Sequence, residues 1–358
     1  MKRLLFLAIL LLISAFATLG AVLAQDEPAP MPTLDELADG WNMLMPGGET
    51  ICARGTPYAF FVHRGDPAKL MVYFQGGGGC WNALTCSANG GTFDDSVSEN
   101  EFDIYQGIFD FEQAANPFRD YTYVVVSYCS GDFHGGNAEN TYTSALGEEV
   151  TVTHRGAVNT AAVLEWTYAN LPAPDSLVIA GSSAGSIGAY FHAEHILDHY
   201  SAANPDLEAL VFGDAGVGVS GETVGDPWGL GSALPDDPAF ETGNMRSVME
   251  TLTRRLITLY PNVPIVAYSN AQDTVQVLFY ELLNGQFPTG RRADAWEAAM
   301  RAHLAGMAEA PNYHYYIADG EQHTILAYPN FYTLDQNGTP LVDWLNAVLA
   351  GETVENVD

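Results

Sequence analysis

Short apolar runs alternate with longer segments of helical periodicity along most of the chain. The apolar runs predict strands at residues 58–63, 70–75, 121–129, 177–180, 207–212, 263–269 and 312–318. Helical spacing of apolar residues predicts helices at 153–171, 186–200, 245–260, 275–283, 293–307 and 341–349. Glycine-rich and polar stretches predict loops at 88–116, 131–147 and 213–244, the last as a cap insertion. Strands that alternate with helices predict an α/β fold with a mostly parallel central sheet and helices on both faces.

The N-terminus has the pattern of a secretory signal peptide. Lys2 and Arg3 precede an apolar run, and small residues before Gln25 provide a cleavage site. We therefore expect a signal peptide over 1–24, a proline-rich linker over 25–40 and a single domain over 41–351. The alternative is an uncleaved anchor, because the apolar run is nearly long enough to span a bilayer. Export would place the protein outside the cell or in a periplasm.

The charge balance excludes several classes of partner. The 358 residues include 13 basic and 44 acidic side chains, which gives a formal net charge of −31. Such a surface repels nucleic acids and anionic membranes. It also disfavours a highly anionic polymer as a substrate. We expect no nucleic-acid partner, and no stable membrane insertion once the signal is removed.

The four cysteines predict two disulfide bonds. Their number is even, and an exported protein meets an oxidising compartment. Cys80 and Cys86 are close together in one loop and are natural partners, which leaves Cys52 to pair with Cys129. A zinc site is the alternative, but these spacings fit no common zinc pattern.

The segment LVIAGSSAGSIG, residues 177–188, is the strongest candidate for chemistry. It contains a G-x-S-x-G motif with Ser183 at its centre, placed between a predicted strand and a predicted helix. That context is typical of a nucleophile elbow, in which a sharp turn exposes the serine hydroxyl at the edge of a sheet. The alternative is a glycine-rich turn without chemistry.

A serine nucleophile needs a base, and the base needs an acid to orient it. Asp273 follows the predicted strand 263–269, and His323 follows the strand 312–318. This order of serine, acid and histidine is that of an α/β-hydrolase, and all three residues would meet at the carboxyl edge of one sheet. The sequence therefore predicts an α/β-hydrolase-like fold. Asp214 and Glu321 are the alternatives for the acid.

Backbone amides must also stabilise the oxyanion that forms in acyl transfer. The amide of Ala184, directly after the serine, is one candidate donor. The glycine run 76–79 after the strand 70–75 is the natural source of others, since glycine lets the backbone approach a substrate closely. The aromatic residues that could line the cleft are Trp81, Phe133 and Trp228.

Four motifs together resemble the pectin acetylesterase/Notum family: FQGGGGCWN at 74–82, YCSGDFHGGN at 128–137, AGSSAGS at 180–186 and QH at 322–323. Members of that family are secreted serine carboxylesterases of α/β-hydrolase type that use no metal. The resemblance implies that Ser183 is the nucleophile and His323 the base. It further implies an oxyanion hole of the Gly77, Gly78 and Ala184 amides, and its cysteine pairs match those given above.

The chain departs from the animal members of that family at two positions. Where they carry the acid, this chain has Ser269, so Asp273 must serve instead. Where they carry an aromatic residue, this chain has Gly78. Because the animal members remove a long acyl chain from a signalling protein, the glycine favours the plant and bacterial deacetylases.

These observations lead to one functional prediction. We expect a secreted, monomeric serine carboxylesterase that acts through a Ser-His-Asp triad and an acyl-enzyme, without a metal or other cofactor. The resemblance implies an acetylated glycan such as acetylated pectin as the substrate. The alternative is a lipase-like or protein O-acyl esterase, or another serine hydrolase on the same fold.

Overall fold

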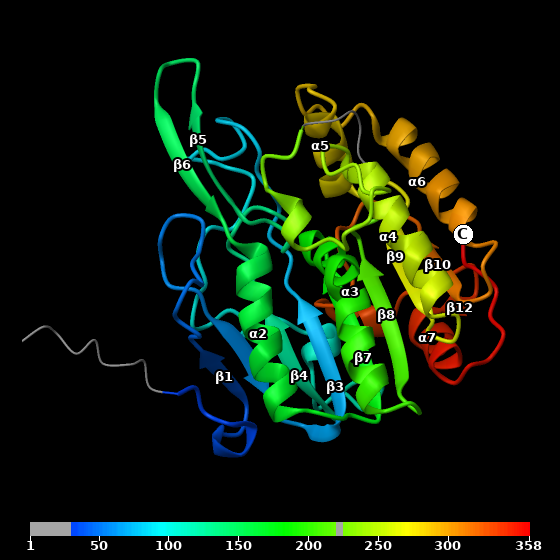
Figure 1. Ribbon diagram of the computed structural model, residues 1–358. Coiled ribbons are helices and arrows are strands. Elements are labelled where there is room, and N and C mark those ends of the chain that lie inside the picture. Colours follow the sequence, from blue (N-terminus) through cyan, green and yellow to red (C-terminus); the bar gives the residue numbers. More distant parts are fainter. Residues whose placement is uncertain (1–29, 220–224) are drawn as a thin grey trace, which may run out of the picture. The chain divides into compact units, whose positions relative to one another are not determined.

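Figure 1 shows the computed structural model, which describes residues 30–219 and 225–358. The predicted signal peptide lies outside the described residues. A compact unit runs from Thr33 to Asp358, so it begins inside the predicted linker and extends beyond residue 351. Its first element, η1 (Leu34–Glu36), buries Leu34. At the other end, Val357 forms a β-bridge with Tyr316.

The core of this unit is a sheet of eight strands in the order β1-β2-β4-β3-β7-β8-β9-β10. Six of these strands, from β4 to β10 in that order, are parallel, and β2 and β1 extend the sheet through antiparallel pairs. The strands are β1 Trp41–Leu44, β2 Phe60–His63, β3 Asp66–Phe74, β4 Tyr121–Val126, β7 Ser176–Ser182, β8 Glu208–Asp214, β9 Ile265–Asn270 and β10 Tyr313–Ala318. This is an α/β-hydrolase-like fold, as predicted.

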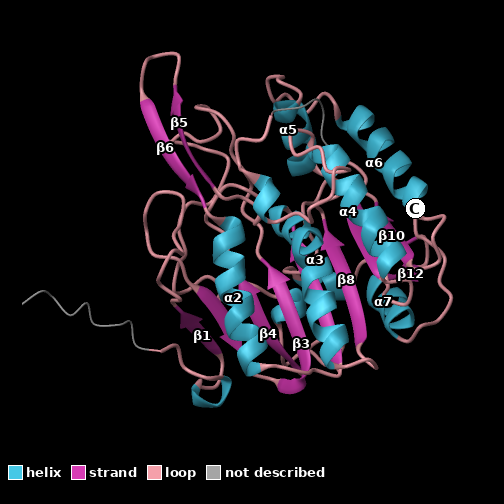
Figure 2. Cartoon of the chain, in the orientation of Figure 1, coloured by secondary structure: helices cyan, strands magenta, loops and turns pink. Residues whose placement is uncertain are grey.

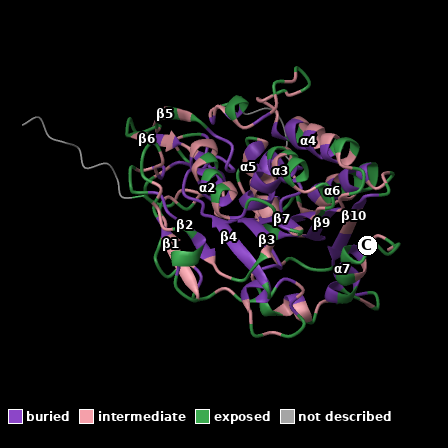
Figure 3. Cartoon of the chain, turned by 60° about the horizontal axis from the view of Figure 1, so that its bottom comes forward, coloured by how far each residue is buried: buried purple, intermediate pink, exposed green. Residues whose placement is uncertain are grey.

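Helices lie on both faces of the sheet. They are α2 Gly156–Asn170, α3 Ala184–Ala203, α4 Met245–Leu259, α5 Thr274–Leu283, α6 Ala293–Met307 and α7 Leu341–Leu349. Figure 3 shows α2, α3, α4 and α6 on one side of the sheet and α7 on the other. The α7 side is completed by the loop that follows β3 and by η4 (Pro329–Tyr332), whose apolar residues share one cluster with the strands. Both faces of the central strands are thereby removed from water.

All seven predicted strands and all six predicted helices are present, with boundaries that shift by a few residues. The continuous apolar run at 121–129 becomes β4, and every residue of β4 is buried. The predicted helix at 153–171 begins later, at Gly156, because residues before it belong to a strand. The central strands could be predicted because strands that are buried on both faces have continuous apolar sequences.

The prediction of a loop at 131–147 was wrong. A hairpin of β5 (Ala138–Thr143) and β6 (Glu149–His154) leaves the body of the unit there, as Figure 1 shows. Half-buried and exposed residues alternate in β5, and in β6 Val152 and His154 are fully buried. The hairpin therefore has the two-residue period of strands with one inward face, but that face is short and was overlooked among the surrounding glycine and polar residues. The short strands β1, β11 (Asp335–Gln336) and β12 (Thr339–Pro340) were also missed.

Both predicted disulfides are present. Cys52 pairs with Cys129, and Cys80 pairs with Cys86. All four cysteines are fully buried. The first bond fastens the segment before β2 to the segment after β4, and the second closes a small loop after the glycine run. In the described residues, no helix is both long and apolar enough to cross a membrane.

We predict that the two disulfides differ in their contribution to stability. The Cys52–Cys129 bond spans 77 residues, and chain-entropy reasoning gives it about 4.5 kcal/mol. The Cys80–Cys86 bond spans 6 residues, and the same reasoning gives it about 2 kcal/mol. Denaturant unfolding of C52A/C129A and C80A/C86A measures both against the wild type. An equal loss in the two variants would contradict the prediction.

Candidate active site

The predicted site residues lie on loops that meet at the carboxyl edge of the parallel strands. Ser183 follows β7, Asp273 follows β9 and His323 follows β10, while the glycine run follows β3. Figure 2 shows the loops gathered at this edge. The structure therefore brings together four segments that lie far apart in the sequence.

Ser183 has a strained backbone between β7 and α3. Its φ of 58° and ψ of −123° are uncommon for a residue with a side chain. Its amide donates to the carbonyl oxygen of Asp214 at 2.7 Å, and α3 begins at the next residue. A Cβ on Gly185 would lie 1.9 Å from the carbonyl oxygen of Phe74, so the close approach of α3 to β3 requires glycine there.

His323 is bonded to a buried carboxylate. Its Nδ1 lies 2.8 Å from Oδ2 of Asp273, which is fully buried at the N-terminus of α5. The same carboxylate accepts the amides of Val275 and Gln276, each at 3.0 Å, and the Gln276 side chain at 3.0 Å. Since these neighbours all donate, Asp273 acts as an acceptor and Nδ1 of His323 carries the hydrogen of the bond.

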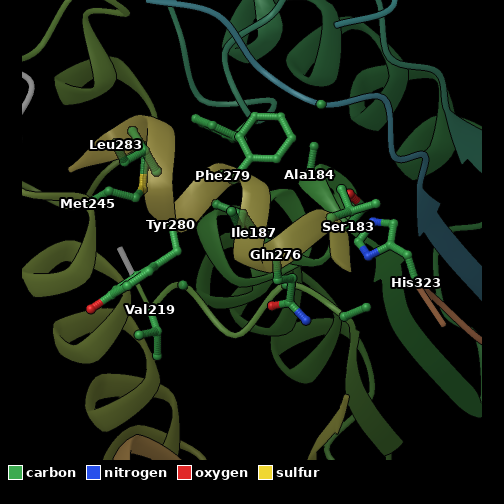
Figure 4. A pocket seen from close by; sticks show the side chains of 16 residues that line it. Ser183, Ala184, Ile187, Val219, Met245, Gln276, Phe279, Tyr280, Leu283 and His323 are labelled. Carbon is green, nitrogen blue, oxygen red and sulfur yellow. The ribbon is translucent and has the colours of Figure 1, made fainter. Parts of the chain in front are cut away.

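The second ring nitrogen of His323 is left as an acceptor beside Ser183. Nε2 is buried and has no hydrogen-bond partner in the part of the chain that the structure describes. Figure 4 shows the His323 ring next to the Ser183 side chain at one end of a pocket. This arrangement places a nitrogen lone pair where it can take a proton from a hydroxyl.

Backbone hydrogen bonds join the two loops that carry Asp273 and His323. The amide of Gln272 donates to the Gly320 carbonyl at 2.9 Å, and the amide of Thr274 donates to the Glu321 carbonyl at 3.2 Å. Directly after the histidine, Thr324 has a positive φ of 63°. The separation of the carboxylate and the ring is thus fixed by the main chain as well as by their own contact.

The glycine run presents unused amides to the same place. Gly77 and Gly78 have φ values of 152° and 77°, and a Cβ on Gly78 would lie 2.0 Å from the Thr92 carbonyl oxygen. Within the described residues, the amides of Gly77, Gly78 and Ala184 donate to no acceptor. Gly78 and Ala184 both line the pocket that Ser183 opens into.

The cavity of that pocket measures about 70 Å³, and the space that includes its open mouth measures about 540 Å³. Ser183 and His323 lie at one end, and Leu283 of α5 lies at the other, as Figure 4 shows. Most of its wall is apolar, formed by Phe133, Ile187, Val219, Met245, Val275, Phe279, Tyr280 and Leu283. Gln276 is the polar side chain between the two ends.

Of the three predicted aromatic contacts, only Phe133 lines the pocket. Trp228 is 1% exposed, and its Nε1 donates to the Cys80 carbonyl oxygen at 2.7 Å. Trp81 is 8% exposed and packs between Trp228 and Phe279. The two tryptophans therefore form a layer behind the pocket, because their large rings are needed to fill the space under the loops.

The family profile described as Pectinacetylesterase matches residues 45–224, half of the chain. The chain belongs to the pectinacetylesterase family. Pectin acetylesterase 4 of Arabidopsis thaliana is 25% identical over 154 residues, which cover 41% of this chain and 37% of that relative. Pectin acetylesterase 5 of the same plant is 24% identical over 154 residues, covering 41% of this chain and 35% of the relative.

In the described residues of this family member, neither of the two alternative acids, Asp214 and Glu321, is hydrogen-bonded to the His323 ring. Asp214 is fully buried, and its carboxylate accepts the Ser182 hydroxyl at 2.6 Å and the amides of Ile325 and Leu326 at 3.0 Å. Glu321 is exposed. Across residues 30–219 and 225–358, no group of three or more His, Cys, Asp or Glu side chains is placed to hold a metal ion.

Sequence reasoning missed Gln276, which connects three parts of the site. Its Nε2 donates to Ser269 Oγ at 2.9 Å as well as to Asp273, and its Oε1 accepts the Val217 amide at 3.1 Å. The Ser269 hydroxyl thus supports the glutamine. The sequence did contain a signal for this role. Gln276 lies three residues after the predicted acid Asp273, and a side chain at that place in a helix reaches back to the N-cap residue.

Asp214 was expected to be either an alternative acid or a cap on the turn that follows it, and its contacts with the loop after His323 were missed. Its main chain accepts the Ser183 amide, while its side chain holds the residues just after His323. Burial raises the pKa of this carboxyl to about 6, although hydrogen bonds from Ser182 and from the Leu326 and Ile325 amides oppose the rise. Its other ionisable neighbours include Tyr73, Tyr268 and His323.

We predict that Asp214 makes the folded state less stable as the pH rises. The folded carboxyl keeps its proton up to about pH 6, whereas the unfolded one loses it near 3.8, so the folded state binds more protons in between. The wild type should therefore lose about 1 to 1.5 kcal/mol from this group between about pH 5 and about pH 7.5. Denaturant unfolding of the wild type and D214N across that range measures the difference. Parallel pH curves for the two proteins would contradict it.

Proposed function

We propose that this protein is a secreted serine carboxylesterase that removes acetyl groups from a polysaccharide such as acetylated pectin. The observation that carries the proposal is the arrangement of Ser183, His323 and Asp273. A buried carboxylate orients the imidazole, and the unpartnered Nε2 lies beside a serine on a strained turn. This is the geometry that activates a serine hydroxyl for acyl transfer.

The reaction would run through an acyl-enzyme. Ser183 Oγ attacks the ester carbonyl carbon while Nε2 of His323 takes the hydroxyl proton. Asp273 keeps the ring in place and stabilises the imidazolium that forms. The tetrahedral intermediate collapses, and His323 returns the proton to the departing alcohol oxygen of the sugar. A water then attacks the acyl-enzyme with His323 again as the base, which releases acetate and restores Ser183.

The amides of Gly77, Gly78 and Ala184 would stabilise the oxyanion in both tetrahedral intermediates. Within residues 30–219 and 225–358 these amides have no acceptor, and Gly78 and Ala184 line one pocket with Ser183. An amide that is fixed before the reaction needs no reorganisation when negative charge appears on the oxygen. The loss of one such donor typically costs a factor of about 100 to 1,000 in rate.

The substrate and the location rest on broader observations. The matched plant relatives bear the name pectin acetylesterase, which supports an acetyl ester as the substrate. A net charge of −31 disfavours polymers with many free carboxylates, so neutral or esterified glycans suit this surface better. The signal-like N-terminus and the two disulfides support secretion.

We predict that S183A and D273N lose activity while S186A keeps it. Ser186 is a matched control, because it is a buried serine three residues further along the chain whose hydroxyl, in the described residues, donates only to the Gly216 carbonyl. Acetate release from acetylated pectin, acetylated xylan and p-nitrophenyl acetate measures kcat. S183A and D273N should fall by a factor of about 10⁴ or more, with S186A within about threefold. An S183A protein that hydrolyses p-nitrophenyl acetate at the wild-type rate would rule out this mechanism.

A second candidate function is the hydrolysis of esters with longer acyl chains. The apolar wall extends from Ser183 to Leu283 along Ile187, Met245 and Phe279, as Figure 4 shows. An acetyl group would cover little of that wall. Each methylene buried there contributes about 0.8 kcal/mol to binding, so a longer chain is favoured at this pocket.

We predict that the pocket accepts the acyl chain of the substrate. Leu283→Trp should then restrict the enzyme to esters with shorter acyl chains. In the wild type, p-nitrophenyl hexanoate should be hydrolysed with a kcat/KM at least equal to that of the acetate. Leu283→Trp fills the far end of the pocket, so the octanoate should lose about tenfold in kcat/KM and the acetate less than about twofold. A wild-type rate that falls steadily from the acetate onward would exclude this second candidate and leave the acetylesterase.

A further inference from the structure

The carbonyl groups of Gln75 and of most of the glycine run after it are held by partners behind the run. Nε2 of His134 lies 2.8 Å from the Gln75 carbonyl oxygen, and the Asp94 amide donates to the Gly77 carbonyl at 2.9 Å. The Tyr128 hydroxyl donates to the Gly78 carbonyl at 2.8 Å, and the Thr92 hydroxyl donates to the Gly79 carbonyl at 2.6 Å. The carbonyl groups are thereby turned away from the pocket.

These contacts fix the direction of the Gly78 amide. A trans peptide points its N–H and C=O in opposite directions, so the bond from Asp94 to the Gly77 carbonyl also orients the N–H of Gly78. On the other side of Gly78, its own carbonyl is held by Tyr128, and the Gly79 amide donates to the Thr92 carbonyl at 3.1 Å. With both peptide planes held, the φ of 77° at Gly78 cannot relax.

Tyr128 also connects the glycine run to a second strained turn. Its hydroxyl accepts the amide of Phe133 at 3.0 Å, and Phe133 and His134 both have a positive φ, of 57° and 63°. Two consecutive left-handed residues other than glycine are uncommon, and surrounding structure must hold them there. The same hydroxyl therefore stabilises two unfavourable backbone conformations, one at Gly78 and one at Phe133.

The surroundings of Tyr128 suit a permanent donor. Its side chain is buried, with the residue 2% exposed, and a Cβ on Gly77 would lie 2.5 Å from its ring. Burial keeps the pKa of Tyr128 well above its usual value, so the hydroxyl retains its hydrogen. In the described residues the hydroxyl bonds to main-chain groups of Gly78 and Phe133, and Tyr128 does not line the pocket.

We propose that Tyr128, assisted by Thr92, is a positioning residue for the oxyanion hole. The Tyr128 hydroxyl holds the Gly78–Gly79 peptide, and the Thr92 hydroxyl holds the next one, Gly79–Cys80. Together they prevent rotation about Gly78 and so aim its amide at the place where the substrate oxygen becomes negative. This inference rests on the esterase function proposed above and assigns a role to a residue that does not touch the substrate. A looser peptide would still admit the ester but would stabilise the transition state less, so the effect belongs in kcat.

The test compares Y128F with Y58F. Tyr58 is a matched control, because it is 1% exposed and its hydroxyl donates to a single carbonyl, that of Ser127, at 3.2 Å. For a short-chain p-nitrophenyl ester, Y128F should lower kcat by about 10- to 100-fold with KM within about twofold. A trifluoromethyl ketone, whose adduct with the serine mimics the tetrahedral oxyanion, should bind Y128F more weakly by the same factor. Y58F should match the wild type in both measurements.

The other outcomes would overturn either the role of Tyr128 or the proposed esterase function. A Y128F protein with wild-type kcat, a loss confined to KM, or an equal loss in Y58F would overturn the role of Tyr128. A wild-type protein without esterase activity would overturn the proposed function, and this inference with it.

If Y128F does not fold, T92V takes its place, because it removes the hydroxyl that holds the next carbonyl. T92V should lower kcat severalfold at unchanged KM, and an unchanged kcat would overturn the positioning role of this peptide.

Discussion

The contact on which the site depends is the close approach of α3 to the end of β3. The carbonyl oxygen of Phe74 lies where a side chain on Gly185 would begin, so the helix can start directly after the strand only with glycine there. In this tight turn Ser183 has its strained conformation, which exposes its hydroxyl at the edge of the sheet. The same approach places the glycine run that follows Phe74 beside the serine. One steric constraint thus positions both the hydroxyl and the amides beside it.

Features that depend on local pattern could be predicted from the sequence. The central strands are buried on both faces, so continuous apolar runs marked them, and the helices carried their own periodicity. The turn at Ser183 could be predicted because its strain demands glycine and alanine at fixed places. Asp273 and His323 were recognised because each follows a strand in an order that leads to one edge of the sheet.

Features that depend on where a side chain finally packs could not be predicted. Trp228 was assigned to the cleft because exposed and buried aromatic residues look alike in a sequence, yet its indole holds the Cys80 carbonyl behind the pocket. Tyr128 belongs to a motif that was noticed, but its hydroxyl acts on Gly78, fifty residues earlier. The β5–β6 hairpin buries only a short inward face around Val152, and its two-residue period is too brief to stand out among the polar residues beside it.

The two buried carboxylates show how this chain accommodates serine at position 269. Asp273 reaches the ring of His323, and Asp214 holds the main chain just after it, so the histidine is fixed at both ends. An acid at position 269 would place a further buried charge near the other two, and like charges so close in a buried site are costly. With serine there, Gln276 can donate one hydrogen to Ser269 and the other to Asp273. Ser269, Gln276 and Asp273 therefore form one coupled arrangement of hydrogen bonds.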